Sequence, residues 1–189
     1  DSYLFLTIGH KVTAYQKAHS ANGIIRMGIG DVTRPLAPAV VEAMHKAADE
    51  MAHKETFQGY PPDQGQAFLR EKIQGYYAKR GVTLELSEIF IGDGAKSDVG
   101  NIVDMFDSDN EVLIPDPVYP VYVDTNLMSG RSIRYIGATE QNGFLPLPDG
   151  DTKGDIIYLC YPNNPTGAVY SKEGLQAWVD FALEHEAVI

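Results

Sequence analysis

Two neighbouring amide side chains, Asn163 and Asn164, follow a short apolar run in the stretch 155–167, which reads DIIYLCYPNNPTG. The run at 156–160 is typical of a strand that is buried on both faces of a parallel sheet. Prolines that lack a backbone donor, and then Gly167, end this strand. Open α/β sheets bind ligands at the ends of their strands, so these amides are candidates for hydrogen bonds to a polar ligand. An ordinary Asn-Pro turn is the alternative interpretation.

A second candidate lies at residues 92–98, where GDGAKSD follows the apolar residues 89–91. This pattern predicts a strand, a glycine turn and a helix in succession, with the helix beginning near Ala95. The first N–H groups of a helix point at one spot and carry a partial positive charge, which suits a phosphate group. Many α/β proteins have this geometry without using it, so the stretch alone leaves both interpretations open.

A third candidate is the aromatic ring of Tyr119, in the turn DPVYP at residues 116–120. The turn follows a strand predicted at 111–115. A ring at this place is either part of the core or a surface on which a flat heterocycle stacks, a contact worth about 0.5 to 1.5 kcal/mol beyond its area burial. Together, the three stretches offer a phosphate pocket, a stacking surface and a hydrogen-bond donor at the strand ends of one sheet.

The elements that must position these residues alternate along the chain. Strands and helices joined by short loops predict an α/β fold with a mostly parallel sheet and helices on both faces. Apolar residues at helical spacing predict helices at 3–15, 40–51, 69–77, 95–106, 122–127 and 171–185. Strands are predicted at 89–91, 111–115, 132–136, 156–160 and from 188 onward. Ser171 and Glu173 are typical of a helix start, and Gly81 is typical of a helix end.

Composition excludes several classes of function. The chain has 189 residues, of which 44% are hydrophobic and 22% charged, with a net charge of −11 and a pI near 4.7. Nucleic acids and anionic membrane surfaces need a basic face, so this charge argues against both as partners. The single cysteine, Cys160, cannot form an intrachain disulfide. A cytoplasmic location is expected, or a plastid if the source is a plant, and no metal site is predicted. The chain is expected to be a fragment.

The loop NNPTG after a buried strand resembles the signature loop of the class I/II aminotransferases, which bind pyridoxal phosphate. Nearly all of the chain resembles one group within that family, the LL-diaminopimelate aminotransferases of lysine biosynthesis. The segments that carry this narrower resemblance read SYLF, GIGDVTRPL, GYPPDQG, GDGAKSD, DPVYPVYVDTN and PNNPTGAV. It implies a fold-type I enzyme that transfers an amino group between LL-2,6-diaminopimelate or tetrahydrodipicolinate and glutamate or 2-oxoglutarate.

The resemblance also implies roles for particular residues in holding the cofactor. Ala95 and Lys96 match the phosphate turn, Tyr119 the ring that stacks on the pyridine, and Asn164 the partner of the phenolic oxygen. Tyr60 matches a tyrosine that reaches the phosphate of the neighbouring subunit, which implies a homodimer. Residues 1–34 would form an N-terminal segment that contacts substrate, and 35–189 the first part of a large cofactor-binding domain.

Substrate contacts are implied for Tyr3, Gly30, Lys96 and Asn164. One departure concerns the substrate's distal ammonium group: the family commonly has GYGPEQG, whereas this chain has GYPPDQG. Asp63 therefore stands in place of a glutamate and keeps the carboxylate with one methylene fewer. Amino acids and 2-oxo acids are the expected small-molecule partners.

No catalytic residue is expected within this chain. Chemistry in the family needs a lysine that forms a Schiff base, an acidic residue at the pyridine nitrogen and an arginine for the substrate carboxylate. The resemblance places all three beyond Ile189, so these 189 residues alone are expected to be inactive. The alternatives are another class I/II aminotransferase, acting on aromatic or aliphatic amino acids, and a non-catalytic α/β module. A dinucleotide-binding domain is disfavoured, because no GxGxxG follows a strand.

Overall fold

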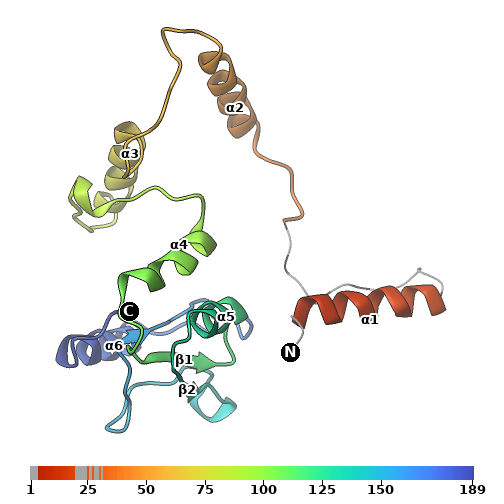
Figure 1. The fold of residues 1–189 in the computed structure, drawn as a ribbon, viewed down its shortest axis with the longest axis vertical. Helices are drawn as coiled ribbons and strands as arrows, with labels where there is room; N and C mark the ends of the chain where they lie inside the picture. Colours follow the sequence, from red (N-terminus) through yellow and green to blue (C-terminus); the bar gives the residue numbers. More distant parts are fainter. Residues whose placement is uncertain (1–3, 20–24, 26, 28–29, 31) are drawn as a thin grey trace. The chain divides into compact units, whose positions relative to one another are not determined.

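The computed structural model of the chain divides into two units, Asp1–Tyr60 and Pro61–Ile189 (Figure 1). The residues that it describes are 4–19, 25, 27, 30 and 32–189. The expected boundary between a segment 1–34 and a domain 35–189 stays a prediction.

The first unit contains helix α1 (Leu4–Ala18) and helix α2 (Pro38–Met51). Both helices were expected from their apolar spacing, and both are confirmed. Pro38 opens α2 at a position where a missing N–H costs nothing, because the first donors of a helix have no intrahelical acceptor. The apolar residues of α2, such as Met44, are exposed within this chain.

The second unit carries the sheet. Its elements in chain order are α3 (Ala67–Ala78), η1 (Leu86–Glu88), α4 (Ala95–Asn101), η2 (Ile102–Met105), β1 (Val112–Asp116), α5 (Pro120–Met128), β2 (Ile133–Gly137), η3 (Glu140–Asn142), β3 (Ile156–Ile157) and α6 (Lys172–Glu184). The strands lie in the order β2-β1-β3, and both pairings are parallel. The expected parallel sheet is therefore confirmed, and Val188 forms a further parallel bridge to Ile156.

Two strand predictions were wrong: the strand at 89–91 is not formed, and the strand at 156–160 is shorter than expected. Residues 89–91 pair with no strand among the described residues, and the backbone N–H of Ile91 donates instead to Gln64 O at 3.0 Å. The predicted strand 156–160 pairs over its first two residues alone. The carbonyl of Leu113 faces β3 and accepts from Tyr158 N, so Pro115, two residues further along β1, faces the same side. Pro115 has no N–H to continue the ladder.

Helices cover both faces of the sheet, as expected. Leu113 and Ile157 point to one face and pack against Trp178 and Phe181 of α6. The alternate residues of the strands, Val112, Ile114 and Ile156, point to the other face and pack against Tyr122 and Val123 of α5. The first four residues of β1, 112–115, are buried, because the strand pairs on both edges and packs on both faces, whereas Asp116 is exposed.

A buried arginine holds the turn that follows α4. Arg131 precedes β2 and is 6% exposed, and its guanidinium donates to the backbone oxygens of Val103, Phe106 and Asp107. The distance to Phe106 O is 2.7 Å. Carbonyls at the end of a helical segment have no intrahelical donor, so the cation satisfies them and favours the negative end of the local dipole.

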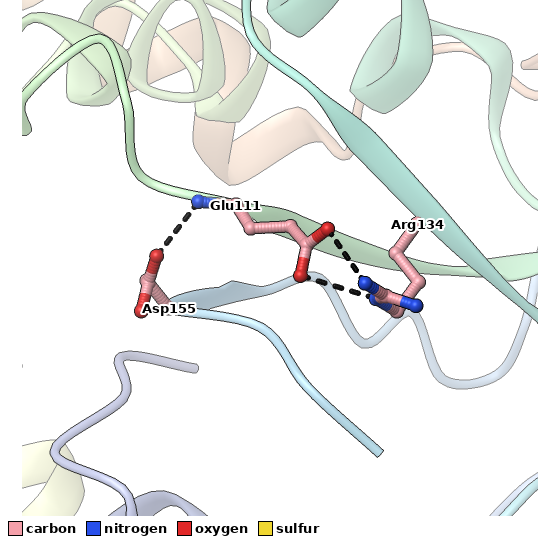
Figure 2. A network of polar contacts seen from close by, with 3 residues as sticks. All are labelled: Glu111, Arg134 and Asp155. Carbon is pink, nitrogen blue, oxygen red and sulfur yellow. Dashed lines mark hydrogen bonds and ion pairs between the residues drawn. The ribbon is translucent and has the colours of Figure 1, made fainter. Parts of the chain in front are cut away.

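A polar network joins the starts of the three strands (Figure 2). The guanidinium of Arg134 donates two hydrogen bonds to the carboxylate of Glu111, at 2.9 and 3.1 Å. Asp155 accepts from the backbone N–H of Glu111 at 2.7 Å, and its own N–H donates to Glu111 O at 2.8 Å. Glu111 therefore ties β2 and β3 to β1 at the edge of the sheet opposite the loops 116–120 and 161–167.

Replacing Arg134 with Gln is expected to lower the free energy of unfolding by about 1 kcal/mol or less, since the pair is partly exposed. The loss is expected to shrink in molar salt, because salt screens exposed ion pairs. Denaturation of the whole protein and of R134Q at low and high salt measures both effects. A larger loss that salt leaves unchanged would contradict this account.

Candidate functional site

The two asparagines in the loop after β3 differ in burial and in hydrogen bonding. Asn163 is 8% exposed, and its amide donates to Thr166 Oγ1 at 2.9 Å and to Pro117 O at 3.1 Å. Asn164 is exposed, and within the described part of the chain its amide has no protein partner. Asn164 is therefore free to bind a ligand, whereas Asn163 is committed to the protein.

In the loop after β1, the ring of Tyr119 contacts Tyr122, which packs against Tyr158. The partly buried Tyr119 ring meets Tyr122 edge to face, with centroids 5.6 Å apart and an interplanar angle of 89°. The ring centroid of Tyr122 in turn lies 4.9 Å from that of Tyr158, the residue that follows β3. Edge-to-face contacts of this kind restrain ring orientation. The Tyr119 ring is thus restrained by Tyr122 of α5, which itself packs against Tyr158.

The two loops are joined to each other. Parallel pairing makes β1 and β3 end at the same edge of the sheet, and the bond from Asn163 to Pro117 O spans their exits. Tyr119 lies two residues after Pro117, and Asn164 directly follows Asn163. The structure therefore joins the loop that carries Tyr119 to the loop that carries Asn164.

The turn before α4 depends on one glycine. Gly94 has φ 136° and ψ 156°, a region that side chains other than hydrogen essentially exclude. Hydrogen bonding in the helix begins with Ser97 N and Asp98 N, which both donate to Gly94 O. Among the described residues, the N–H groups of Ala95 and Lys96 have no protein acceptor. Helix α4 packs against α5, whose first residue follows Tyr119.

Arg70 makes several of the hydrogen bonds that hold the loop carrying Asp63. Arg70 donates to Gly65 O at 3.2 Å, to Gln64 Oε1 at 3.1 Å and to Leu86 O at 3.0 Å. Gln64 O also accepts from Ile91 N, which joins this loop to the segment entering the Gly94 turn. The carboxylate of Asp63 itself is exposed. Nothing in the residue spacing predicted this role of Arg70, because its acceptors are mainly backbone carbonyls.

The remaining predicted contacts lie in the first unit or outside the described residues. Tyr60 is 99% exposed and Gly30 is exposed. Tyr3 lies outside the described residues. The parts that these three residues play in a site therefore stay predictions.

Burial raises the pKa of the Tyr122 hydroxyl to about 12, with a smaller contribution from the neighbouring Cys160. The Tyr122 hydroxyl therefore keeps its proton to a higher pH than an exposed tyrosine does.

A ring, a free amide and a helix start are groups that suit the face, an edge and the phosphate of a planar anionic molecule. That Tyr119, Asn164 and the turn at Ala95 form one such site stays a prediction. Within the described ranges there is no group of three His, Cys, Asp or Glu that could hold a metal ion. No described helix has both the length and the apolar composition required to cross a membrane.

The sequence matches the profile of a family described as aminotransferase class I and II over residues 22–189. The chain belongs to this family. LL-diaminopimelate aminotransferases from Lachnospira eligens and Parabacteroides distasonis are 54% and 53% identical, and the alignments cover 100% of this chain. They cover 50% and 49% of those proteins, so the chain spans about half the length of the curated relatives it matches.

Solved structures confirm the predicted fold class. The L,L-diaminopimelate aminotransferase from Chlamydomonas reinhardtii matches with a TM-score of 0.86 and 38% identity, over 99% of this chain and 48% of that one. An aspartate aminotransferase from Rhizobium meliloti, at 24% identity and a TM-score of 0.82, shares the fold. These enzymes are fold-type I aminotransferases, a family that uses pyridoxal phosphate.

Replacing Gly94 with Ala is expected to destabilise the protein by about 1 to 3 kcal/mol, because the backbone must leave its present region or bear the strain. No atom lies within 4 Å of the added methyl group, so backbone strain is the cause. Gly100 provides a matched control inside α4, again with open space around it. G100A is expected to be neutral or stabilising by up to about 1 kcal/mol. Thermal unfolding of both variants measures the difference, and equal effects would contradict this explanation.

Stability is expected to fall between pH 10 and 12 through Tyr122. The unfolded tyrosine loses its proton near the ordinary pKa of 10.0, whereas the folded residue keeps it to about 12. The unfolded state therefore binds fewer protons in this window, and rising pH favours it. Y122F is expected to show a flatter decline in unfolding temperature than Y135F, which removes an exposed tyrosine hydroxyl. Parallel curves from pH 10 to 12 would rule out this role of Tyr122.

Proposed function

We propose that the whole protein is a pyridoxal-phosphate-dependent transaminase. It would transfer an amino group between LL-2,6-diaminopimelate or tetrahydrodipicolinate and glutamate or 2-oxoglutarate, in lysine biosynthesis. The observation that carries this proposal is the 54% identity to an LL-diaminopimelate aminotransferase along the full chain. Membership of the aminotransferase family supports the reaction type. The similarity to LL-diaminopimelate aminotransferases supports LL-diaminopimelate as the substrate.

The residues present fit the cofactor. Pyridoxal phosphate has a flat pyridine ring, a phenolic oxygen and a phosphate. The half-buried Tyr119 ring offers a stacking surface, and the exposed amide of Asn164 offers a donor that the protein leaves unused. The unpartnered N–H groups of Ala95 and Lys96 suit a phosphate at the positive end of a short helix.

Each residue then has a physical task. Tyr119 packs on the ring face and keeps water from it, with its orientation restrained by Tyr122. Asn164 donates to the phenolic oxygen and stabilises its anionic form. Bound pyridoxal phosphate supplies an electron sink for chemistry at the amino acid's Cα. Tyr60 is proposed to reach the phosphate of the second subunit of a homodimer.

Substrate recognition is assigned to Tyr3, Gly30, Asp63, Lys96 and Asn164. Asp63 would pair with the distal ammonium group of diaminopimelate through a charge-assisted hydrogen bond. Arg70 holds the two residues that follow Asp63, Gln64 and Gly65, while the carboxylate of Asp63 stays exposed. A cytoplasmic location, or a plastid in a plant, completes the proposal.

No lysine of this chain is assigned to the Schiff base. Lys96 alone belongs to the predicted cofactor residues, and it lies in the phosphate turn. The lysine, the acidic residue at the pyridine nitrogen and the arginine for the substrate carboxylate are proposed to lie in the portion of the whole protein that corresponds to the other half of its relatives.

A second candidate is a class I/II aminotransferase with a different amino donor. The observation that favours it is Asp63 itself, because its carboxylate reaches one methylene less far than the glutamate common in the family. A shorter reach leaves room for a different distal group on the substrate.

Amino-donor profiling of the whole protein tests both candidates. LL-diaminopimelate is expected to give the highest kcat/KM, and D63N is expected to lower that value by roughly 10-fold or more, since a hydrogen bond to a charged group contributes about 1.5 to 3 kcal/mol. Glutamate lacks a distal ammonium group, so its kcat/KM provides the control and should change little. Equal or higher kcat/KM with aromatic or aliphatic donors would favour the second candidate.

A further inference from the structure

The buried side-chain amide of Asn163 donates both of its hydrogens to other groups of the protein. One goes to Thr166 Oγ1 at 2.9 Å, within its own loop. The other goes to Pro117 O at 3.1 Å, in a loop 46 residues away in sequence. This second bond is the hydrogen bond, among the described residues, that joins the loop of Tyr119 to the loop of Asn164.

The backbone of Asn163 is held as firmly as its side chain. Its N–H donates to Ala168 O at 2.9 Å, and its carbonyl accepts from Gly167 N at 2.7 Å. Because these bonds close the loop around Asn163, the position of the next residue, Asn164, follows from that of Asn163. The loop of Tyr119 is attached to the same point through Pro117.

We propose that Asn163 is a positioning residue, whose amide sets the spacing between the Tyr119 ring and the Asn164 amide and thereby the affinity and tilt of the ligand between them. The inference rests on the proposed function, in which that ligand is pyridoxal phosphate. Asn163 acts through its neighbours and does not touch the cofactor. Displacements of about 1 Å at such a site have large effects on binding and catalysis, so a buried tie between the loops is consequential.

The chemistry of the tie requires an amide. Both contacts are donated by Asn163, and an aspartate at the same place presents only acceptors when ionised. Its carboxylate would face the carbonyl of Pro117 and repel it, while the hydroxyl of Thr166 can rotate to donate. Asn163→Asp therefore breaks the bond between the loops and keeps the size of the side chain and its local partner.

The test uses the whole protein with Asn163→Asp and two measurements. In the cofactor-free protein, hydrogen exchange of peptides covering 116–122 is expected to become faster. With pyridoxal phosphate added, the dissociation constant is expected to rise about 10-fold, as for the loss of a buried hydrogen bond of about 1.4 kcal/mol. The circular dichroism of the bound cofactor is expected to weaken, because the ring is held less uniformly.

A matched control is Asn142→Asp. The amide of Asn142 also donates to a backbone carbonyl, that of Gly137 at 2.8 Å, but it joins no part of the two loops. N142D is expected to leave the exchange of 116–122 and the cofactor affinity unchanged. Equal changes in N142D and N163D would overturn the proposal, because they would reflect a general loss of stability.

A pH profile separates positioning from a merely structural loss. A protonated aspartate regains one donor. The cofactor affinity of N163D, relative to that of the wild type, is therefore expected to rise as pH falls toward about 5.

If N163D fails to fold, Asn163→Ser replaces it. Serine is uncharged and too short to reach both acceptors, so faster exchange and weaker cofactor binding are again expected. Wild-type exchange and affinity in whichever variant folds would overturn the proposal. Failure of the wild-type protein to bind pyridoxal phosphate would instead overturn the proposed function, while the exchange measurement would still decide whether Asn163 joins the loops.

Discussion

The parallel pairing of β1 with β3 is the constraint on which the rest of the structure depends. Because the two strands run in the same direction, their last residues emerge at one edge of the sheet. The loop of Tyr119 (116–120) and the loop of Asn164 (161–167) then start within hydrogen-bonding distance of each other, although they are far apart in the sequence. An antiparallel arrangement of the same strands would send Tyr119 and Asn164 to opposite edges. Burial of β1 between α5 and α6 makes this arrangement costly to change.

The sheet separates stability from ligand binding. At the edge where the strands begin, Glu111 joins β2 and β3 to β1 through Arg134 and Asp155, and at the other edge the side chain of Asn164 stays exposed. Polar groups that the protein satisfies internally hold the frame, and polar groups that it leaves unsatisfied are available to a ligand. Asn163 and Asn164 show this division in adjacent residues. The same residue type is committed in one case and free in the other, because one side chain points into the protein and the next points out.

Most of the fold was predictable from the sequence, since apolar spacing and breakers act locally. The helices around Met44, Tyr76 and Trp178 were expected at their observed places, and so were the strands that became β1 and β2. The two strand errors have non-local causes. Residues 89–91 have the composition of a strand but no pairing partner among the described residues, and β3 is cut short by Pro115 on the neighbouring strand. A strand needs an adjacent chain, and a local pattern cannot supply one.

The candidate site divides in the same way. Residue types alone pointed to Tyr119, Asn164 and the turn at Ala95, because a ring, an amide and a helix start have chemistry that can be read one residue at a time. The sequence offered Asn163 to a ligand as well, but its amide instead donates to Thr166 Oγ1 and Pro117 O. The roles of Arg70 and Arg131 were not foreseen, since both act mainly on backbone carbonyls, which every residue carries and no sequence pattern marks. The amino-acid sequence by itself therefore indicates which chemical groups could bind a ligand and which family the protein resembles. Which of two adjacent asparagines is buried, and which distant loop it ties, follows from packing in three dimensions, because burial depends on neighbours that are remote along the chain.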